Sequence, residues 1–437
     1  MAIYLDHAAT TPMSPEVLAA YVSALSVVGN PSSIHSQGQN AKRMLEEARE
    51  QVAASLGADA VEVTFTSGGT EAINLAVKGL YWARSGAGGP STSSGTGVVS
   101  GPGRVPVPGV VSVSGVVPGP GRVSGPGRVP VPELVEGPRR VLIAAGEHHA
   151  TIDAAAWLAA SEGAIVEEVP VDAVGRIDLG ALERMLGPDV ALVSVLLANN
   201  EVGTIQPIGE VVALASRFDV PVHVDAVAAY GYLPIDFHAL GVAALSVSAH
   251  KIAGPVGVGA LVIARTATVV PLIHGGSQQR ARSGTQDAAG AVAFGVAATR
   301  AAEGIEARQV RLGALRDRLI AGIQTAVPTA ILRGDPVDRL PGNAHFTFPG
   351  CEGDSLLFLL DVAGFSVSTG SACQAGVPEA SHVLLAMGLS EADARGALRI
   401  TLGSDTTADE IDAFVAALPA AVERAGVAGL ADRAVRA

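Results

Sequence analysis

Blocks of apolar and polar residues alternate along most of the 437-residue chain, with two different periods. Residues 38–56 carry charges on one helical face and small apolar residues on the other, which predicts an amphipathic helix. Similar patterns predict four further helices, at 69–84, 149–161, 179–186 and 208–218. Short apolar runs predict seven strands, at 61–66, 140–145, 165–171, 190–198, 222–227, 245–249 and 259–264. Because strands and helices alternate at this spacing, we expect a mainly parallel sheet covered by helices on both faces.

The pattern changes near residue 287. Long helices are expected from there to residue 323, and shorter strands at 344–348 and 398–402 have helices between and after them. This arrangement predicts a second, smaller α+β unit, and a cleft between two such units commonly binds a ligand. We therefore expect three parts: an N-terminal segment over 1–15 that associates with the small unit, a large domain over 16–265, and helices with a small C-terminal domain over 266–437.

One segment, 85–140, interrupts the large domain. It has no aromatic residue, and Gly, Pro, Ser and Val dominate it. The sequence Ser-Gly-Pro-Gly-Arg-Val-Pro-Val-Pro occurs at 100–108 and again at 124–132. Such a composition cannot form a packed core and predicts a disordered insert. A surface-loop expansion is the simplest interpretation, and a docking arm for a partner is the alternative.

Composition narrows the function classes. Hydrophobic residues make up 49% of the chain, yet the longest apolar runs, such as 190–198, are far shorter than the roughly 18 residues that a membrane span needs. The first residues show no basic stretch followed by an apolar one, so we expect no signal peptide and a cytoplasmic location. A net charge of −13 argues against direct binding of nucleic acid, whose phosphates attract basic surfaces.

Lysine is rare in this chain, which contains only Lys42, Lys78 and Lys251. The first two lie on predicted helices and are interpreted as surface residues. Lys251 follows an apolar strand, and ligands bind at strand ends in α/β sheets. Burial there would lower its pKa and free the amine to bond covalently with a carbonyl group. Taken alone, however, Lys251 fits a surface position equally well.

Three further positions suggest a cofactor site. Asp225 ends a predicted strand, where a carboxylate can keep a pyridoxal ring nitrogen protonated, although a helix cap is the commoner role. Thr-Ser-Gly-Gly-Thr-Glu at 66–71 joins a strand to a helix and suits a phosphate, or simply a turn and cap. His148 follows a strand and could stack on a cofactor and move protons. Its neighbour His149 is expected to face elsewhere.

Two positions suggest substrate chemistry. Arg399 lies in an apolar strand, where it could bind a substrate carboxylate or form an internal ion pair. Of the two cysteines, Cys373 lies between small residues in Ser-Thr-Gly-Ser-Ala-Cys-Gln-Ala-Gly and is interpreted as an accessible thiol. Cys351 is interpreted as structural. Two cysteines cannot form a zinc site by themselves, and we expect no metal.

Several motifs occur in a characteristic order. They are Tyr-Leu-Asp-His-Ala-Ala-Thr-Thr-Pro at 4–12, Gly-Asn-Pro-Ser-Ser at 29–33, Thr-Ser-Gly-Gly-Thr-Glu at 66–71, Glu-His-His-Ala at 147–150, Asn-Asn-Glu-Val-Gly at 199–203, His-Val-Asp-Ala at 223–226, Ser-Ala-His-Lys at 248–251, Arg-Ser-Gly-Thr at 282–285 and Ser-Thr-Gly-Ser-Ala-Cys at 368–373. Together they make the chain resemble the cysteine desulfurases of the nitrogen-fixation and iron–sulfur-cluster type. These belong to the class-V aminotransferase group of fold-type I pyridoxal-phosphate enzymes. The resemblance covers nearly the whole chain outside the insert.

The resemblance implies a fold, a cofactor and a reaction. The fold would be a mainly parallel, seven-stranded-type sheet in a large domain with a smaller α+β domain. Lys251 would bind pyridoxal 5'-phosphate as a Schiff base, and Cys373 would take the sulfur of L-cysteine as a persulfide, releasing alanine. The loop around Cys373 would pass that sulfur to an acceptor, such as an iron–sulfur scaffold or a tRNA-thiolation enzyme.

The resemblance also assigns binding roles. Asp225 would pair with the ring nitrogen, His148 would stack on the ring, and Asn200 would contact the ring hydroxyl or the substrate. Arg399 would bind the cysteine carboxylate. The phosphate would be bound by Gly69, Thr70, Ser248 and His250, together with Thr285 from the second subunit of a homodimer.

The chain departs from the family pattern at two places. Ala228 stands where the family usually has Gln, which contacts the cofactor hydroxyl, and the stretch before Arg282 is one residue shorter than usual. These departures bear on the cofactor contact and on the role of Thr285. The alternatives are a selenocysteine lyase-like enzyme, a class-V aminotransferase that uses no thiol, or a degenerate homologue that only binds cofactor or partners.

Overall fold

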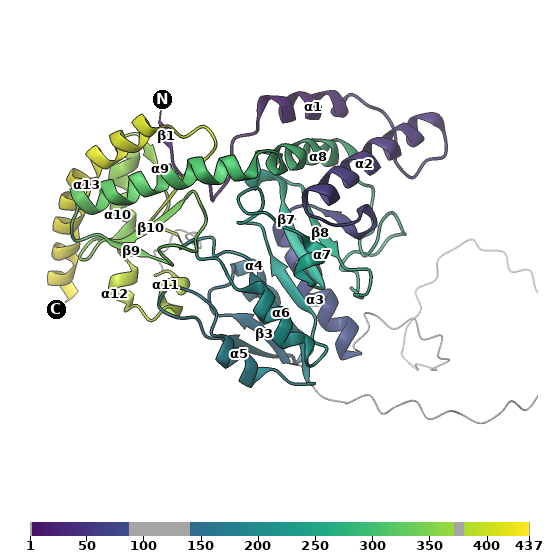
Figure 1. The fold of residues 1–437 in the computed structure, drawn as a ribbon, viewed down its shortest axis with the longest axis horizontal. Coiled ribbons are helices and arrows are strands. Elements are labelled where there is room, and N and C mark those ends of the chain that lie inside the picture. The colour runs from purple at the N-terminus through teal and green to yellow at the C-terminus, as the bar shows by residue number, and fades with distance from the viewer. Residues whose placement is uncertain (1, 87–139, 371–379, 437) are drawn as a thin grey trace, which may run out of the picture.

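A seven-stranded sheet forms the centre of the computed structural model, which describes residues 2–86, 140–370 and 380–436 (Figure 1). The insert expected at 85–140 lies outside the described residues over 87–139. The strand order is β2-β8-β7-β6-β5-β3-β4. The strands are β2 (Val63–Thr66), β3 (Arg140–Ala144), β4 (Ile165–Val169), β5 (Val190–Leu196), β6 (Val222–Asp225), β7 (Ala244–Ser248) and β8 (Gly259–Ile263).

The pairing of the strands confirms a mainly parallel sheet. Strands β3 to β7 all run parallel to one another. Strand β8 runs antiparallel to both β7 and β2. The connecting helices are α3 (Gly69–Ser85), α4 (His149–Glu162), α5 (Leu179–Met185), α6 (Ile208–Ser216) and α7 (Phe237–Leu240). Because β3, β5, β6 and β7 point the same way, their carboxyl ends meet along one edge of the sheet.

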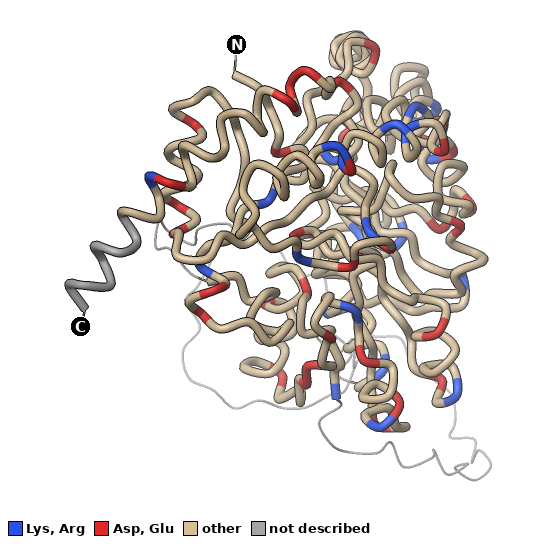
Figure 2. The backbone as a smooth tube through the Cα atoms, turned by 60° about the vertical axis from the view of Figure 1, so that its left-hand side comes forward, with Lys and Arg blue, Asp and Glu red and all other residues tan. Residues whose placement is uncertain are grey.

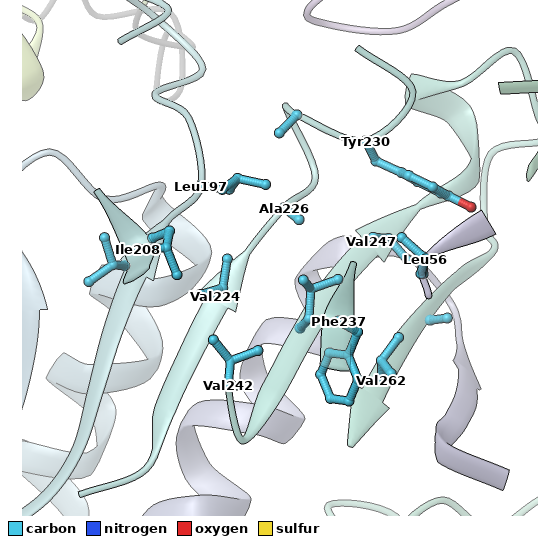
Figure 3. Packing of buried hydrophobic residues seen from close by; sticks show 14 of the residues in the cluster. Leu56, Leu197, Ile208, Val224, Ala226, Tyr230, Phe237, Val242, Val247 and Val262 are labelled. Carbon is cyan, nitrogen blue, oxygen red and sulfur yellow. The ribbon is translucent and has the colours of Figure 1, made fainter. Parts of the chain in front are cut away.

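Helices cover both faces of this sheet. On one face, α3 and α4 pack against residues such as Ile143 and Leu261. On the other face lie α5, α6, α7, α2 (Ser36–Ser55) and α8 (Ala288–Ala302). There Val224, Val247 and Val262 from three neighbouring strands point toward Phe237 and Leu56 (Figure 3). Successive side chains of each strand point to opposite faces of the sheet, and helices cover both faces. A buried strand therefore appears in the sequence as a continuous apolar run.

A second core lies around a three-stranded antiparallel sheet in the order β12-β10-β9. Its strands are β9 (Ile331–Arg333), β10 (Asn343–Thr347) and β12 (Ala397–Thr401). The helices of this half are α9 (Ile305–Ala326), α10 (Gly353–Val362), α11 (His382–Ala386), α12 (Glu391–Ala394) and α13 (Ala408–Arg436). The N-terminal β1 (Ile3–Tyr4) pairs in parallel with β11 (Phe365–Ser366), and Leu5 is buried in the second core. We accordingly propose that the chain divides into an N-terminal segment over 1–15, a large domain over 16–265 and a C-terminal part over 266–437.

Several element boundaries differ from the sequence expectation. The strand expected at 222–227 ends at Asp225, because the backbone N–H of Val227 donates to the Asp225 carboxylate and the chain turns there. Helix α1 (Pro15–Leu25) was not expected at all. Val17 and Ala24 of this helix are buried, but Leu18, Val22 and Leu25 are exposed, so its apolar residues do not mark a single face.

Charged residues are interspersed over the described chain. Figure 2 shows Asp and Glu next to Lys and Arg in most parts of the fold. No described helix is both long enough and apolar enough to cross a lipid bilayer.

Candidate active site

A cavity of about 400 Å³ opens at the carboxyl ends of the parallel strands. Nine of the residues selected from the sequence line it: Gly69, Thr70, His148, Asn200, Asp225, Ser248, His250, Lys251 and Arg399. They come from regions up to 330 residues apart in sequence, and the strand ends bring them together. Thr285 is exposed and does not line this cavity. Cys373 lies outside the described residues.

Lys251 lies in the short 3-10 turn that follows β7. Its Nζ donates to the backbone carbonyls of Ala8 and Ala9, the latter at 3.0 Å. Burial and, secondly, the positive charge of Arg399 lower the pKa of Lys251 to about 8, against the opposing effects of Asp225 and Asp6. Near neutral pH a useful fraction of this amine is therefore unprotonated, as a covalent amine ligand requires.

Asp225 is buried at the end of β6. Its Oδ1 accepts a hydrogen bond from the N–H of Val227 at 2.9 Å. Burial raises the pKa of Asp225 to about 6, although this hydrogen bond and the charge of Lys251 lower it. The carboxylate is thus ionised at neutral pH but only weakly solvated, so it can stabilise a protonated nitrogen placed beside it.

Glu147 is a second buried carboxyl group, which the sequence analysis did not select. Its Oε1 accepts from the N–H of Leu196 at 2.7 Å, and its Oε2 has no hydrogen-bond partner among the described residues. Burial, and then the charge of Asp225, raise the pKa of Glu147 well above its ordinary value. Glu147 therefore keeps its proton to a higher pH than an exposed glutamate does. The sequence feature that could have identified Glu147 is its place directly before His148 and after an apolar strand.

Neutral histidines surround the cavity. His148 precedes α4, and its Nδ1 accepts from the N–H of Ala150 at 3.0 Å, which fixes the ring. Burial, followed by the charge of Lys251, lowers the pKa of His148 to about 4, and the same two causes lower that of His250 to about 4. The expectation that His149 faces elsewhere was wrong: it lines the cavity, with its ring 4.8 Å from that of His382. The first turn of α4 lies at the cavity, so both neighbours reach it.

The turn between β2 and α3 provides a cradle for an anion. A Cβ atom at Gly69 would lie 2.8 Å from Cγ2 of Val227, so this position has room only for glycine. Facing it, the buried Oγ of Ser248 has no hydrogen-bond partner among the described residues. A free hydroxyl, the N–H groups at the start of a 17-residue helix and the ring of His250 suit a phosphate group.

Arg399 enters the cavity from β12 and connects the two halves of the molecule. Its Nη1 donates to the carbonyl of Asn200 at 3.0 Å, and its Nη2 pairs with Asp6 at 3.0 Å. Its Nε is buried without a partner among the described residues. The internal ion pair expected from the sequence is therefore present, and binding of a substrate carboxylate stays a prediction for a guanidinium that also lines the cavity.

Ala228 borders this cavity and a smaller one of about 30 Å³ behind it. The smaller space is also lined by Asn200, Tyr232, Lys251 and Asn343. The short side chain thus leaves room where a longer amide would reach toward the ligand. The smaller cavity is about the size of one water molecule.

Comparison with known proteins identifies the relatives of this fold and site. The family model described as aminotransferase class V matches residues 3–89 and 131–414, which leaves the middle of the predicted insert unmatched. An "IscS-like cysteine desulfurase" of Mycobacterium tuberculosis is 47% identical and aligns with 98% of each chain. A solved structure named "NIFS-LIKE PROTEIN" has a TM-score of 0.80 and 31% identity, covering 97% of this chain and 100% of that one. A structure of "SspA in complex with cysteine" has a TM-score of 0.70 and 29% identity, over 92% and 98% of the two chains.

Proposed function

Because the chain belongs to the cysteine desulfurases of the class-V aminotransferase family, we propose that the cavity at the carboxyl ends of β5, β6 and β7 is where it acts on L-cysteine. The protein is a pyridoxal-phosphate-dependent enzyme that removes the sulfur of L-cysteine and leaves alanine. One observation carries the assignment of the site: Lys251, Asp225 and the anion cradle formed by Gly69 and Ser248 line the same cavity.

The donor set fits pyridoxal phosphate. The unpartnered Ser248 hydroxyl and the start of α3 would hold the phosphate, with Thr70 and His250 beside them. Asp225 would hold the ring nitrogen, Lys251 the aldehyde carbon, and His148 would stack on the ring. Bound there, the cofactor supplies an electron sink for the carbon atoms of the substrate.

The side chains of the protein would then have separate tasks. Arg399 would bind the substrate carboxylate, and Asn200 would contact the substrate or the ring hydroxyl. Lys251 would move a proton between substrate carbons, because its pKa of about 8 lets it exist in both protonation states. The Cys373 thiolate would form a bond to the substrate sulfur as the carbon–sulfur bond breaks, and the carbon would take up a proton and leave as alanine.

Partners and location complete the proposal. We propose that the enzyme acts as a cytoplasmic homodimer in which Thr285 of each subunit reaches the phosphate in the other. We also propose that the sulfur on Cys373 passes to a protein acceptor, such as an iron–sulfur scaffold or a tRNA-thiolation enzyme.

The direct test is a product balance. Purified protein with bound cofactor, given L-cysteine and a thiol reductant, should release sulfide and alanine in equal amounts. Both products would be quantified over the same time course, and selenocysteine would be tested as the substrate in a separate reaction. Bound cofactor with neither product would contradict the assignment and favour a degenerate homologue, and turnover of selenocysteine alone would favour a lyase.

The pKa of Lys251 predicts how cofactor loading depends on pH. Only the neutral amine bonds to the aldehyde, so attachment to cofactor-free protein should speed up about tenfold per pH unit up to about pH 8 and level off above it. Arg399→Leu should move this midpoint to higher pH, because the arginine charge lowers the pKa of the lysine. The rate would be followed by the absorbance of the attached cofactor.

The matched control for this experiment is Arg318→Leu. Arg318 also pairs with an aspartate, Asp412, but both are exposed and lie away from the cavity. Its midpoint should equal that of the unaltered protein. An equal midpoint in Arg399→Leu would show that Arg399 does not act on Lys251.

A further inference from the structure

Glu201 is a buried carboxylate that none of the proposed steps uses. It lies in the turn after β5, with an exposed fraction of 2%, and lines the cavity. Its N–H donates to Oδ1 of Asn199 at 2.9 Å, and its carbonyl accepts from Nδ2 of Asn343 at 3.0 Å. The backbone of Glu201 is therefore held on both sides, and its side chain projects from a fixed point.

The carboxylate of Glu201 contacts two residues that are close to each other in the sequence but far from Glu201. The Oγ of Ser381 donates to Oε2 of Glu201 at 2.5 Å. The same hydroxyl accepts from the N–H of Leu384 at 3.2 Å and so caps α11.

Gly370 meets the same oxygen atom. A Cβ at this position would lie 2.9 Å from Oε2 of Glu201 and 3.2 Å from Nε2 of His345. The φ angle of Gly370 is +97°, which also favours glycine. The backbone of residue 370 is thus packed between the Glu201 carboxylate and the buried, neutral ring of His345.

Gly370 and Ser381 stand on either side of Cys373 in the sequence. Cys373 follows Gly370 by three positions. It precedes Ser381 by eight positions. Gly370 is the last described residue before Cys373, and Ser381 lies one position after the first described residue that follows it.

We propose that Glu201 is a positioning residue for sulfur transfer, which holds both ends of the Cys373-bearing segment at the cavity. This inference rests on the proposed function, in which Cys373 attacks the substrate sulfur. Glu201 touches no reacting atom. It acts by keeping Gly370 and Ser381 at fixed places, so its removal weakens the approach of the thiol while the cofactor and substrate contacts remain.

Single-turnover measurements on the cofactor-loaded enzyme test this. Glu201→Ala should slow formation of the Cys373 persulfide, measured by mass spectrometry of the alkylated peptide, by about 10- to 100-fold, the range expected for a misplaced reacting group. The absorbance of the bound cofactor, and its change on adding L-cysteine, should stay within about twofold, because those steps precede the action of the thiol. Glu201→Gln should recover most of the rate, since its amide oxygen still accepts from Ser381.

Ser381→Ala provides a second variant, and Ser390 provides its matched control. Ser390 caps α12 through the N–H of Asp393 at 3.2 Å, as Ser381 caps α11, but it is exposed and contacts no cavity residue. Ser381→Ala should slow persulfide formation, and Ser390→Ala should not. Adding Ser381→Ala to Glu201→Ala should cost little more, because both variants remove one contact.

The outcomes separate this inference from the proposed function. Persulfide formation at the normal rate in Glu201→Ala and Ser381→Ala would overturn the positioning role, and so would an equal loss of cofactor binding and sulfur transfer. Continued sulfide release by Cys373→Ala would instead overturn the role of Cys373, whatever the Glu201 variants do.

Discussion

We expect Lys251→Ala to lose at least about 10⁴-fold in the rate of sulfide release, because one side chain both holds the cofactor and moves the proton. The amine is presented to the cavity by the carbonyls of Ala8 and Ala9 and has a pKa of about 8. No other lysine lines this cavity within the described residues. A neighbouring side chain therefore cannot replace it.

The loss should be visible in the cofactor before it is visible in turnover. Pyridoxal phosphate should dialyse away from Lys251→Ala, while the unaltered protein should retain it. Lys78→Ala is the matched control: Lys78 is on α3, with its Nζ 4.3 Å from the ring centre of Trp157, and should be dispensable for activity. Retained cofactor absorbance and turnover in Lys251→Ala would contradict the role given to this lysine.

The fold class could be predicted because it depends on features that are local in the sequence. Apolar runs such as 190–198 match buried strands, and β3 to β6 are each followed by a helix that returns the chain for the next parallel strand. Helix α1 was missed because its apolar residues do not lie on one face: Val17 and Ala24 are buried, whereas Leu18 and other apolar side chains are exposed. The N-terminal strand β1 is two residues long, and its partner Phe365 is about 360 positions away, which no local pattern shows.

The candidate site shows the same limit. Lys251, Asp225 and Ser248 end strands or follow them directly, so their place at the ligand edge follows from the topology of the sheet. Glu147 and Glu201 were missed because an isolated Glu between apolar segments usually indicates an exposed loop. Their burial depends on contacts with Leu196 and Ser381, which are distant in the sequence.

The electrostatics of the site depend on three dimensions as well. Burial lowers the pKa of His148 and that of His250 to about 4, so both rings are neutral at neutral pH. It raises the pKa of Glu147 well above its ordinary value and that of Asp225 to about 6. The Asp225 carboxylate thus lies near the proposed ring nitrogen, and the Arg399 guanidinium lies near the proposed substrate carboxylate. A cofactor and an amino acid that carry the opposite charges at those points would be bound in one orientation.

We expect Cys373→Ala to stop sulfide release while leaving the cofactor in place. The substitution removes the proposed sulfur acceptor but none of the residues that line the cavity, so cofactor absorbance and its change on adding L-cysteine should persist. Activity should fall to the background of the reaction without protein. The measurement is sulfide and alanine in the same sample, together with the cofactor spectrum.

Cys351→Ala is the matched control for Cys373→Ala. Cys351 has an exposed fraction of 4% within the second core, and burial, followed by the charge of Glu352, raises the pKa of its thiol. It is thus less able to form the reactive thiolate. The control should retain full activity and lose about 1 kcal/mol of unfolding free energy, because a buried side chain is shortened.

The pair of variants also distinguishes two chemical routes. If Cys373→Ala still releases sulfide and alanine, sulfur leaves the substrate without a protein thiol, as the selenocysteine lyase-like alternative would allow. If both products stop together while the cofactor still responds to L-cysteine, the carbon–sulfur bond breaks only when a thiol accepts the sulfur. That result would show that proton movement at Lys251 and sulfur transfer to Cys373 are separate steps of one reaction.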